Sequence, residues 1–104
     1  MMIMVIGSLT VAPEALDTVM AASLEHVHRS RLEPGCLSHA VHLDAENPGR
    51  LVFVEEWSDM AALQAHFVVP ASTGFAALMS KHATEGPELA IFDANLLRRV
   101  GGKK

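Results

Sequence analysis

Trp57 and His66 carry reactive groups at nearby positions in the chain. A neutral histidine is a general base near pH 7, and an indole N–H donates a hydrogen bond to a developing oxygen anion. Trp57 ends a strand-like run and His66 lies a short helix further on, so the two could face one cavity. We interpret His66 as a candidate base and Trp57 as an orienting donor. The alternative is structural, because a helix histidine often only packs and a lone tryptophan is commonly a core aromatic.

Glu55 lies two residues before Trp57 and shares its strand face with Phe53. Its carboxylate is expected either to turn into the pocket or to pair with backbone donors or an arginine at a dimer seam, and the seam is favoured. An apolar slot around these groups would hold an aromatic ring. Its expected residues, which could equally be plain core, are Phe53, Met60, Phe67, Phe75 and Met79.

The six histidines invite a metal hypothesis that their spacing does not support. His39 and His42 point to opposite faces of a strand, and His26 and His28 lie roughly 200° apart on a helix. Neither pair is a ready two-ligand site, so we predict no metal. Cys36 is the single cysteine, which excludes an internal disulfide, and no base can be paired with it as a nucleophile.

The composition predicts one compact domain, because the chain has 104 residues of which 50% are hydrophobic and 19% charged. Twelve acidic and eight basic residues give a net charge of −4. The basic residues cluster only in the segment 98–104, which argues against nucleic acid as a partner. No apolar run reaches the roughly 18 residues of a membrane span, and residues 1–11 lack the features of a signal peptide. We therefore expect a cytoplasmic protein with a domain over residues 1–97 and a basic tail.

Hydrophobic periodicity and turn residues predict six elements in the order βαββαβ. Ser58 is the expected N-cap of the second helical region, and a turn at 46–49 is expected to join the two strands of a hairpin. The expected strands are residues 2–11, 36–44, 50–57 and 88–97. The first expected helix is residues 13–31, and the second helical region has two pieces, residues 58–66 and 75–82.

This order predicts a ferredoxin-like α+β fold with a four-stranded antiparallel sheet and helices on one face. Residues 51–54 are apolar at every position, so both faces of their strand should be buried. The helices can cover only one face. We therefore expect a second copy of the chain to cover the other, giving a homodimeric α+β barrel.

Several residues in this order and spacing resemble the antibiotic biosynthesis monooxygenase family, over about residues 2–97. They are Glu33-Pro34-Gly35-Cys36-Leu37, Asp44, Pro48, Phe53, Glu55, Trp57, Ala62-Leu63, His66, Pro70 and Phe75. The resemblance implies a dimeric α+β barrel with a pocket between sheet and helices, and it places a helix histidine facing that pocket at His66. It also suggests His39 as a second polar group, at a position where the family often has an aromatic residue.

The function implied by the resemblance is a cofactor-independent monooxygenase that oxidises a small aromatic quinol or phenol with O₂. Ala71-Ser72 stand where many relatives have a His-Phe pair, and Gly7-Ser8 stand where haem-degrading relatives use an asparagine. The chain has no tyrosine, a donor used by polyketide-tailoring relatives. The alternative is a non-catalytic dimeric barrel that binds an apolar small molecule or haem.

Overall fold

The computed structural model describes residues 2–103, in which four β-strands and three α-helices follow the predicted order. The second helical region is divided into two helices. The elements are β1 (Met2–Val11), the 3-10 helix η1 (Pro13–Ala15), α1 (Leu16–Ser30), β2 (Cys36–Asp44), β3 (Asn47–Trp57), α2 (Met60–Val68), α3 (Pro70–His82) and β4 (Ala83–Ala94).

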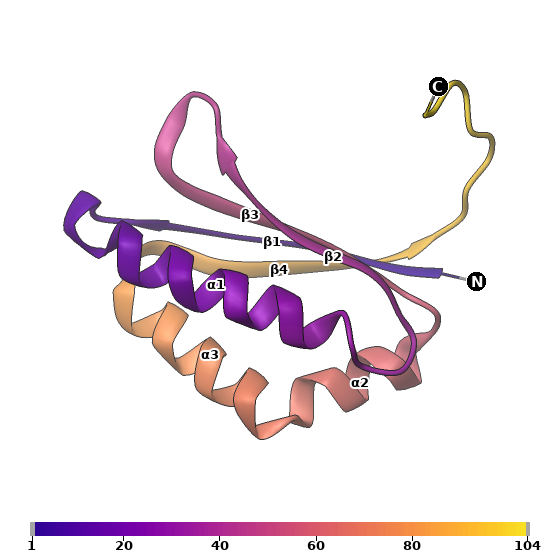
Figure 1. The fold of residues 1–104 in the computed structure, drawn as a ribbon, viewed down its shortest axis with the longest axis horizontal. Coiled ribbons are helices and arrows are strands. Elements are labelled where there is room, and N and C mark those ends of the chain that lie inside the picture. The colour runs from indigo at the N-terminus through magenta and orange to yellow at the C-terminus, as the bar shows by residue number, and fades with distance from the viewer. Residues whose placement is uncertain (1, 104) are drawn as a thin grey trace.

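The strands form one antiparallel sheet in the order β2-β3-β1-β4 (Figure 1). Glu55 on β3 pairs with Val5 on β1 and with His39 on β2. Directly paired residues of antiparallel strands project from the same face, so Glu55 and His39 share one face of the sheet. This topology confirms the predicted ferredoxin-like α+β fold.

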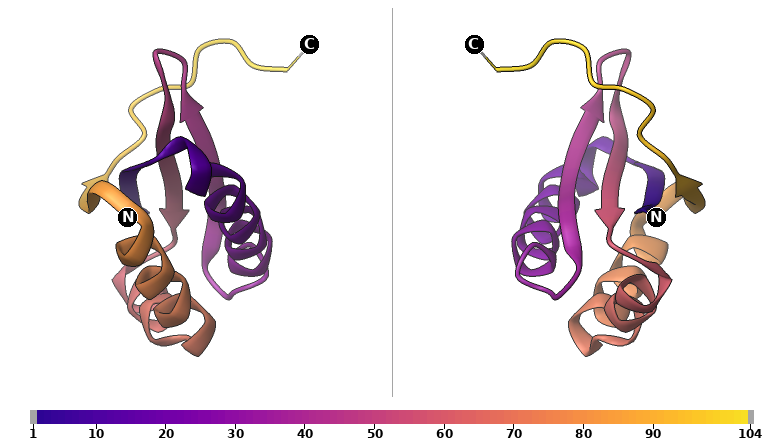
Figure 2. Two further views of the ribbon diagram at one scale, coloured as in Figure 1. Left: turned by 90° about the vertical axis from the view of Figure 1, so that its left-hand side faces the viewer. Right: turned by 90° about the vertical axis from the view of Figure 1, so that its right-hand side faces the viewer.

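All three α-helices cover the same face of the sheet (Figures 1 and 2). Burial alternates along β1 and β3, where Val5, Leu9, Phe53 and Trp57 are among the residues turned toward the helices. The buried apolar residues form two clusters on this face. The functional groups described below lie between the helices and this face.

Asp59 caps α2, and the predicted cap at Ser58 is wrong. The Asp59 side chain accepts a hydrogen bond from the amide of Ala62 at 2.8 Å, and its backbone is extended as an N-cap requires. Ser58 lies one residue before the N-cap. Its amide donates a hydrogen bond to the carbonyl of Gly35 at 2.8 Å and so ties the start of α2 to the turn before β2. Gly35 has φ of +81°, which confirms that a glycine is needed at this turn.

Helix α3 begins at Pro70, five residues before the predicted start at Phe75. Proline is favourable at the first position of a helix, because the amide that it lacks would have no intrahelical partner there. Gly74 lies inside the helix and faces open space. The break between α2 and α3 is therefore confined to Val69.

The hairpin turn is shorter than predicted, since β3 begins at Asn47 and only Ala45 and Glu46 form the loop. Asp44 holds the loop, because its carboxylate accepts from the amide of Glu46 at 2.9 Å and from Nη1 of Arg50 at 3.2 Å. The polar composition indicated a turn but not its two-residue length.

Strand β4 begins and ends earlier than the predicted range 88–97. Gly86, with φ of +78°, and Pro87 lie inside the strand, where the pairing with β1 shifts register. Such a bulge accommodates both residues without ending the strand. At the other end Ala94 pairs with Met2, the first residue of β1 that the structure describes, and residues 95–103 form no helix or strand.

The outer face of the sheet, which the helices do not cover, is apolar near its centre. Ile6 pairs with Val54 and with Ala90 there, and Phe92 lies on the same face. Ile6 and Phe92 are 41% and 47% exposed. The C-terminal segment runs away from this sheet (Figure 1).

No single helix within residues 2–103 is long and apolar enough to cross a membrane. Helices α2 and α3 meet the requirements of length and composition only as a pair, which is bent by 74°.

Candidate functional site

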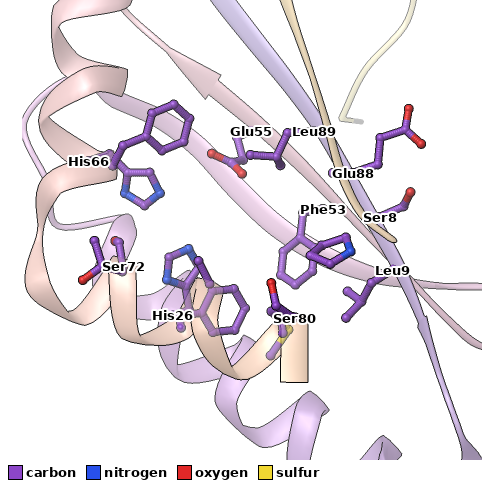
Figure 3. Close-up of a pocket in the computed structure, with 17 residues that line it drawn as sticks. Ser8, Leu9, His26, Phe53, Glu55, His66, Ser72, Ser80, Glu88 and Leu89 are labelled. Carbon is purple, nitrogen blue, oxygen red and sulfur yellow. The ribbon is translucent and has the colours of Figure 1, made fainter. Parts of the chain in front are cut away.

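A pocket of about 510 Å³ lies between the sheet and the helices, with β1, β3 and β4 on one side and α1, α2 and α3 on the other (Figure 3). Its wall is mainly apolar, with a few polar groups. The lining residues are Gly7, Ser8, Leu9, His26, Phe53, Glu55, His66, Phe67, Ser72, Thr73, Phe75, Ala76, Met79, Ser80, Pro87, Glu88 and Leu89.

The pocket brings together most of the residues expected from the sequence. His66 and the carboxylate of Glu55 line it, and its apolar part includes Phe53, Phe67, Phe75 and Met79. Trp57, His39 and Met60 do not line it. Met60, the first residue of α2, is 39% exposed.

Trp57 is fully buried next to the pocket, where its ring lies against that of His66 at a centroid distance of 4.6 Å. Its indole N–H donates to Oε1 of Glu55 at 2.9 Å. The donor expected to reach a substrate is therefore already engaged within the protein. Trp57 positions Glu55 and packs against His66 in this geometry.

Glu55 is a buried carboxylate that faces the pocket and not a dimer seam. Burial by itself would raise the pKa of Glu55. The nearby imidazole of His39, together with the hydrogen bond from the Trp57 indole and the proximity of His66, outweighs that cost and holds the pKa of Glu55 below its ordinary value. Nε2 of His39 lies 3.3 Å from Oε1 of Glu55 without the alignment of a hydrogen bond, and Nδ1 of His39 is buried with no partner among residues 2–103.

His66 is oriented by Glu33, a residue that the sequence indicated only as part of a turn. Nδ1 of His66 lies 2.8 Å from Oε1 of Glu33, and His66 is only 3% exposed. An ionised carboxylate can only accept, so Nδ1 of His66 carries the proton in this pair. A ring that carries only this one proton keeps a lone pair on Nε2, which is the atom that a general base needs.

His26 on α1 is the pocket histidine that sequence reasoning missed. Its ring stacks on Phe75 at a centroid distance of 4.0 Å, and Nη2 of Arg29 lies 2.8 Å from its Nδ1. Burial lowers the pKa of His26 to about 3, with further lowering by His39, His66 and Arg29. The imidazole is therefore neutral at pH 7.

A helical pattern that includes polar residues would have found His26. It lies seven residues after the buried Val19 and so occupies the same helix face, together with the buried Ser23 and Ser30. The apolar Leu24 on the same helix is 43% exposed.

The rings of His26, His39 and His66 form a cluster in which one nitrogen from each lies within 4.8 Å of the others. Three imidazoles could close around a divalent transition-metal ion from such positions. The sequence argument against a metal considered pairs within one element, whereas these residues come from α1, β2 and α2. Arg29 opposes coordination by His26, because a ring that accepts at Nδ1 carries its proton on Nε2.

Comparison with known proteins gives one family match and one curated relative. The model of the family described as antibiotic biosynthesis monooxygenase matches residues 2–78. An uncharacterized protein of Synechocystis, sll1783, is 35% identical over 68 residues, which cover 65% of this chain and 46% of that protein. The chain thus aligns with less than half the length of this relative.

Solved structures share the fold over nearly the whole chain. A structure described as an antibiotic biosynthesis monooxygenase is 34% identical, with a TM-score of 0.83 over 90% of this chain and 99% of the other. A conserved protein from Methanosarcina mazei is 26% identical, with a TM-score of 0.83 over 88% and 90% of the two chains. Rv0793 from Mycobacterium tuberculosis has a TM-score of 0.86 over 96% and 100%, and at 23% identity it speaks for the fold alone.

Proposed function

We propose that this chain, which belongs to the antibiotic biosynthesis monooxygenase family, oxidises a small aromatic quinol or phenol with O₂ in the pocket beneath its sheet. The reaction needs no added cofactor, because the deprotonated substrate is its own reductant. The observation that carries the proposal is the Glu33–His66 pair, in which the carboxylate holds Nδ1 at 2.8 Å. That pairing leaves Nε2 of His66 as a base in an apolar slot.

The base begins the reaction by removing a proton from the substrate. Nε2 of His66 takes the proton, and the anion gives one electron to O₂. The resulting carbon radical and superoxide join through a new C–O bond as a peroxide. The peroxide first takes back the proton from His66 at its distal oxygen, which gives a hydroperoxide on a carbon that still carries one hydrogen. The base removes that hydrogen as a proton, its electron pair forms the C=O bond as the O–O bond breaks, and the departing hydroxide takes the proton and leaves as water. The substrate thus loses one hydroxyl hydrogen and one ring C–H hydrogen to water and gains one oxygen, and its four electrons reduce O₂.

The apolar wall supplies the remaining requirements of this chemistry. Phe53 and Phe75 contact each other edge to face, with ring centroids 5.9 Å apart, and form an apolar wall against which a flat ring can pack beside Met79. Burial of the ring excludes water from the radical pair and places the reacting carbon close to the base. The pocket volume of about 510 Å³ is sufficient for a small fused aromatic system.

The test is O₂ uptake by the purified, metal-free protein with a panel of quinols and anthrone-type phenols, measured against spontaneous oxidation. His66→Ala should reduce uptake by about a hundredfold, the usual scale for a general base. Glu33→Gln should reduce it less, since the amide oxygen still accepts from Nδ1. His28→Ala, which removes an exposed histidine on α1, is the matched control and should show the O₂ uptake of the native chain.

Uptake that never exceeds the spontaneous rate with any substrate would refute the oxygenase. If the same protein nevertheless bound aromatic compounds in the pocket, the alternative of a non-catalytic binding barrel would replace it.

We further propose that the active form is a homodimer formed through the outer face of the sheet. Ile6, Val54 and Phe92 place apolar surface there that no helix covers. Sedimentation equilibrium at micromolar concentration should give a dimer. Ile6→Glu should give a monomer, whereas Leu32→Glu, at an 87% exposed position away from the strands, should leave the dimer intact. A monomeric native chain would refute the proposal.

A further inference from the structure

His26 presents a second buried imidazole to the pocket. It lines the pocket opposite His66, with the two ring centroids 5.2 Å apart (Figure 3). Its stacking on Phe75 fixes the plane of the ring. The reaction described above gives His66 a role but leaves this buried imidazole unused.

Arg29 determines which nitrogen of His26 carries the proton. A guanidinium group can only donate hydrogen bonds, so Nη2 of Arg29 at 2.8 Å requires Nδ1 of His26 to accept. In a neutral ring the proton must then be on Nε2. Glu33 imposes the opposite tautomer on His66, because its carboxylate requires a proton on Nδ1.

The two rings therefore present complementary atoms to the pocket. Nε2 of His26 is a donor and Nε2 of His66 is an acceptor. Neither atom has a hydrogen-bond partner among residues 2–103, and neither is one of the fully buried unpaired atoms there. One ring nitrogen of His26 lies within 4.8 Å of one of His66. A single oxygen atom can bond to two atoms at that separation, since each hydrogen bond spans about 2.8 Å.

We propose that His26 donates a hydrogen bond from Nε2 to the phenolate oxygen of the bound aromatic substrate, and that Arg29 is the positioning residue that keeps this proton on Nε2. The substrate class rests on the proposed function, but anion binding by His26 does not require the oxygenase reaction. The pocket then selects rings whose hydroxyl group lies between a base and a fixed donor. His66 removes the proton of that hydroxyl, and His26 stabilises the resulting charge.

A neutral donor suits this task. The pKa of His26 is lowered to about 3, so the ring donates a hydrogen bond without giving up its proton to the phenolate. An imidazolium with a pKa of about 3 would be a far stronger acid than a phenol and would protonate the anion that must react with O₂.

The test uses 4-nitrophenol, a phenol whose ionisation is visible in its absorbance and which does not undergo the oxygenation. Titration of the native protein at several pH values should show tighter binding of the phenolate than of the phenol. His26→Ala should weaken phenolate binding by about tenfold to a hundredfold, the scale of a hydrogen bond to a charged group. His26→Gln retains an N–H donor and should recover part of that loss. His28→Ala, an exposed neighbour on the same helix, should bind as the native chain does.

Arg29 is tested by a signature that a purely structural role would not change. Ring nitrogen NMR shifts of His26 should report a proton on Nε2 in the native chain and in Arg29→Lys, which also only donates. Arg29→Ala should show a mixture of tautomers and weaker phenolate binding, with circular dichroism confirming the fold.

Three results would overturn the inference: a proton on Nδ1 of His26, phenolate binding unaffected by both His26 variants, or stoichiometric binding of Co²⁺ by His26, His39 and His66 with the absorbance of a three-nitrogen site. If phenolate binding depends on His26 but no substrate supports O₂ uptake, the proposed reaction fails and the donor role stands.

Discussion

Acid should destabilise this protein through His26 well before its carboxylates are protonated. The pKa of His26 is about 3 in the folded chain, and that of a histidine in an unfolded chain is about 6.5. Between these values the unfolded state binds a proton that the folded state does not. Stability from this residue is therefore complete above about pH 6.5 and falls as the pH decreases toward 3.

The magnitude follows from the two pKa values. At pH 5 the unfolded histidine is almost fully protonated, so each pH unit below 6.5 costs about 1.4 kcal/mol and the total is about 2 kcal/mol. The result at pH 5 hardly depends on the folded value, because any folded pKa below about 4 leaves the buried ring neutral. Glu55 does not contribute in this window, since its pKa is lowered from 4.5 and it stays ionised.

The assay is urea unfolding at pH 7.5 and at pH 5, followed by the fluorescence of Trp57, the single tryptophan. His26→Gln removes the titrating ring, so its free energy of unfolding should fall by about 2 kcal/mol less than that of the native chain between the two pH values. His28→Gln is the matched control, since His28 is exposed on the same helix and its loss should leave the native pH dependence. Equal pH dependence in the native chain and His26→Gln would refute the assignment of a buried neutral imidazole.

Three further substitutions test a helix cap, a turn and a helix beside the site. Asp59→Ala should lower the free energy of unfolding in urea by about 1 kcal/mol, because it removes the cap of α2. Ser58→Ala should lower it much less. The reverse order would contradict the observed cap. Gly35→Ala should cost roughly 1–3 kcal/mol, because φ is +81° and the new Cβ would meet a side chain at 2.5 Å. Gly74→Ala, inside α3 and facing open space, should instead stabilise the protein by up to about 1 kcal/mol, and a loss of stability there would contradict the helix through Gly74.

The fold was predictable from the sequence because its signals are local and repeated. The almost wholly apolar run of residues 2–11, rich in branched side chains, and the Glu33-Pro34-Gly35 turn each point to one structure, and the order of elements then leaves few topologies. The errors fall where local signals conflict with tertiary context. Pro70 was expected to interrupt a helix and instead begins one, and Pro87 was expected to precede a strand and instead lies at a bulge within it.

The pocket was predictable in part, through residues whose neighbours in the chain are also neighbours in space. Phe53 and Glu55 alternate on one strand, and His66 lies on the short helix that follows. His26 and Glu33 were missed because their partners come from other elements, and no spacing in one sequence brings α1 beside α2. The sequence does show that His26 is a polar residue on the apolar face of a helix. A polar residue in such a position is a candidate for a functional site.

The three clustered histidines are the same residue type, yet their partners give them different chemistry. A guanidinium group leaves His26 a donor, and a carboxylate leaves His66 an acceptor. His39 has Glu55 near Nε2 at 3.3 Å and nothing at Nδ1 among the described residues, so it supports the carboxylate without reaching the pocket. Exchange of the partners should therefore exchange the roles: the arginine and the carboxylate, more than the rings themselves, decide which nitrogen can take a proton and which can stabilise an anion.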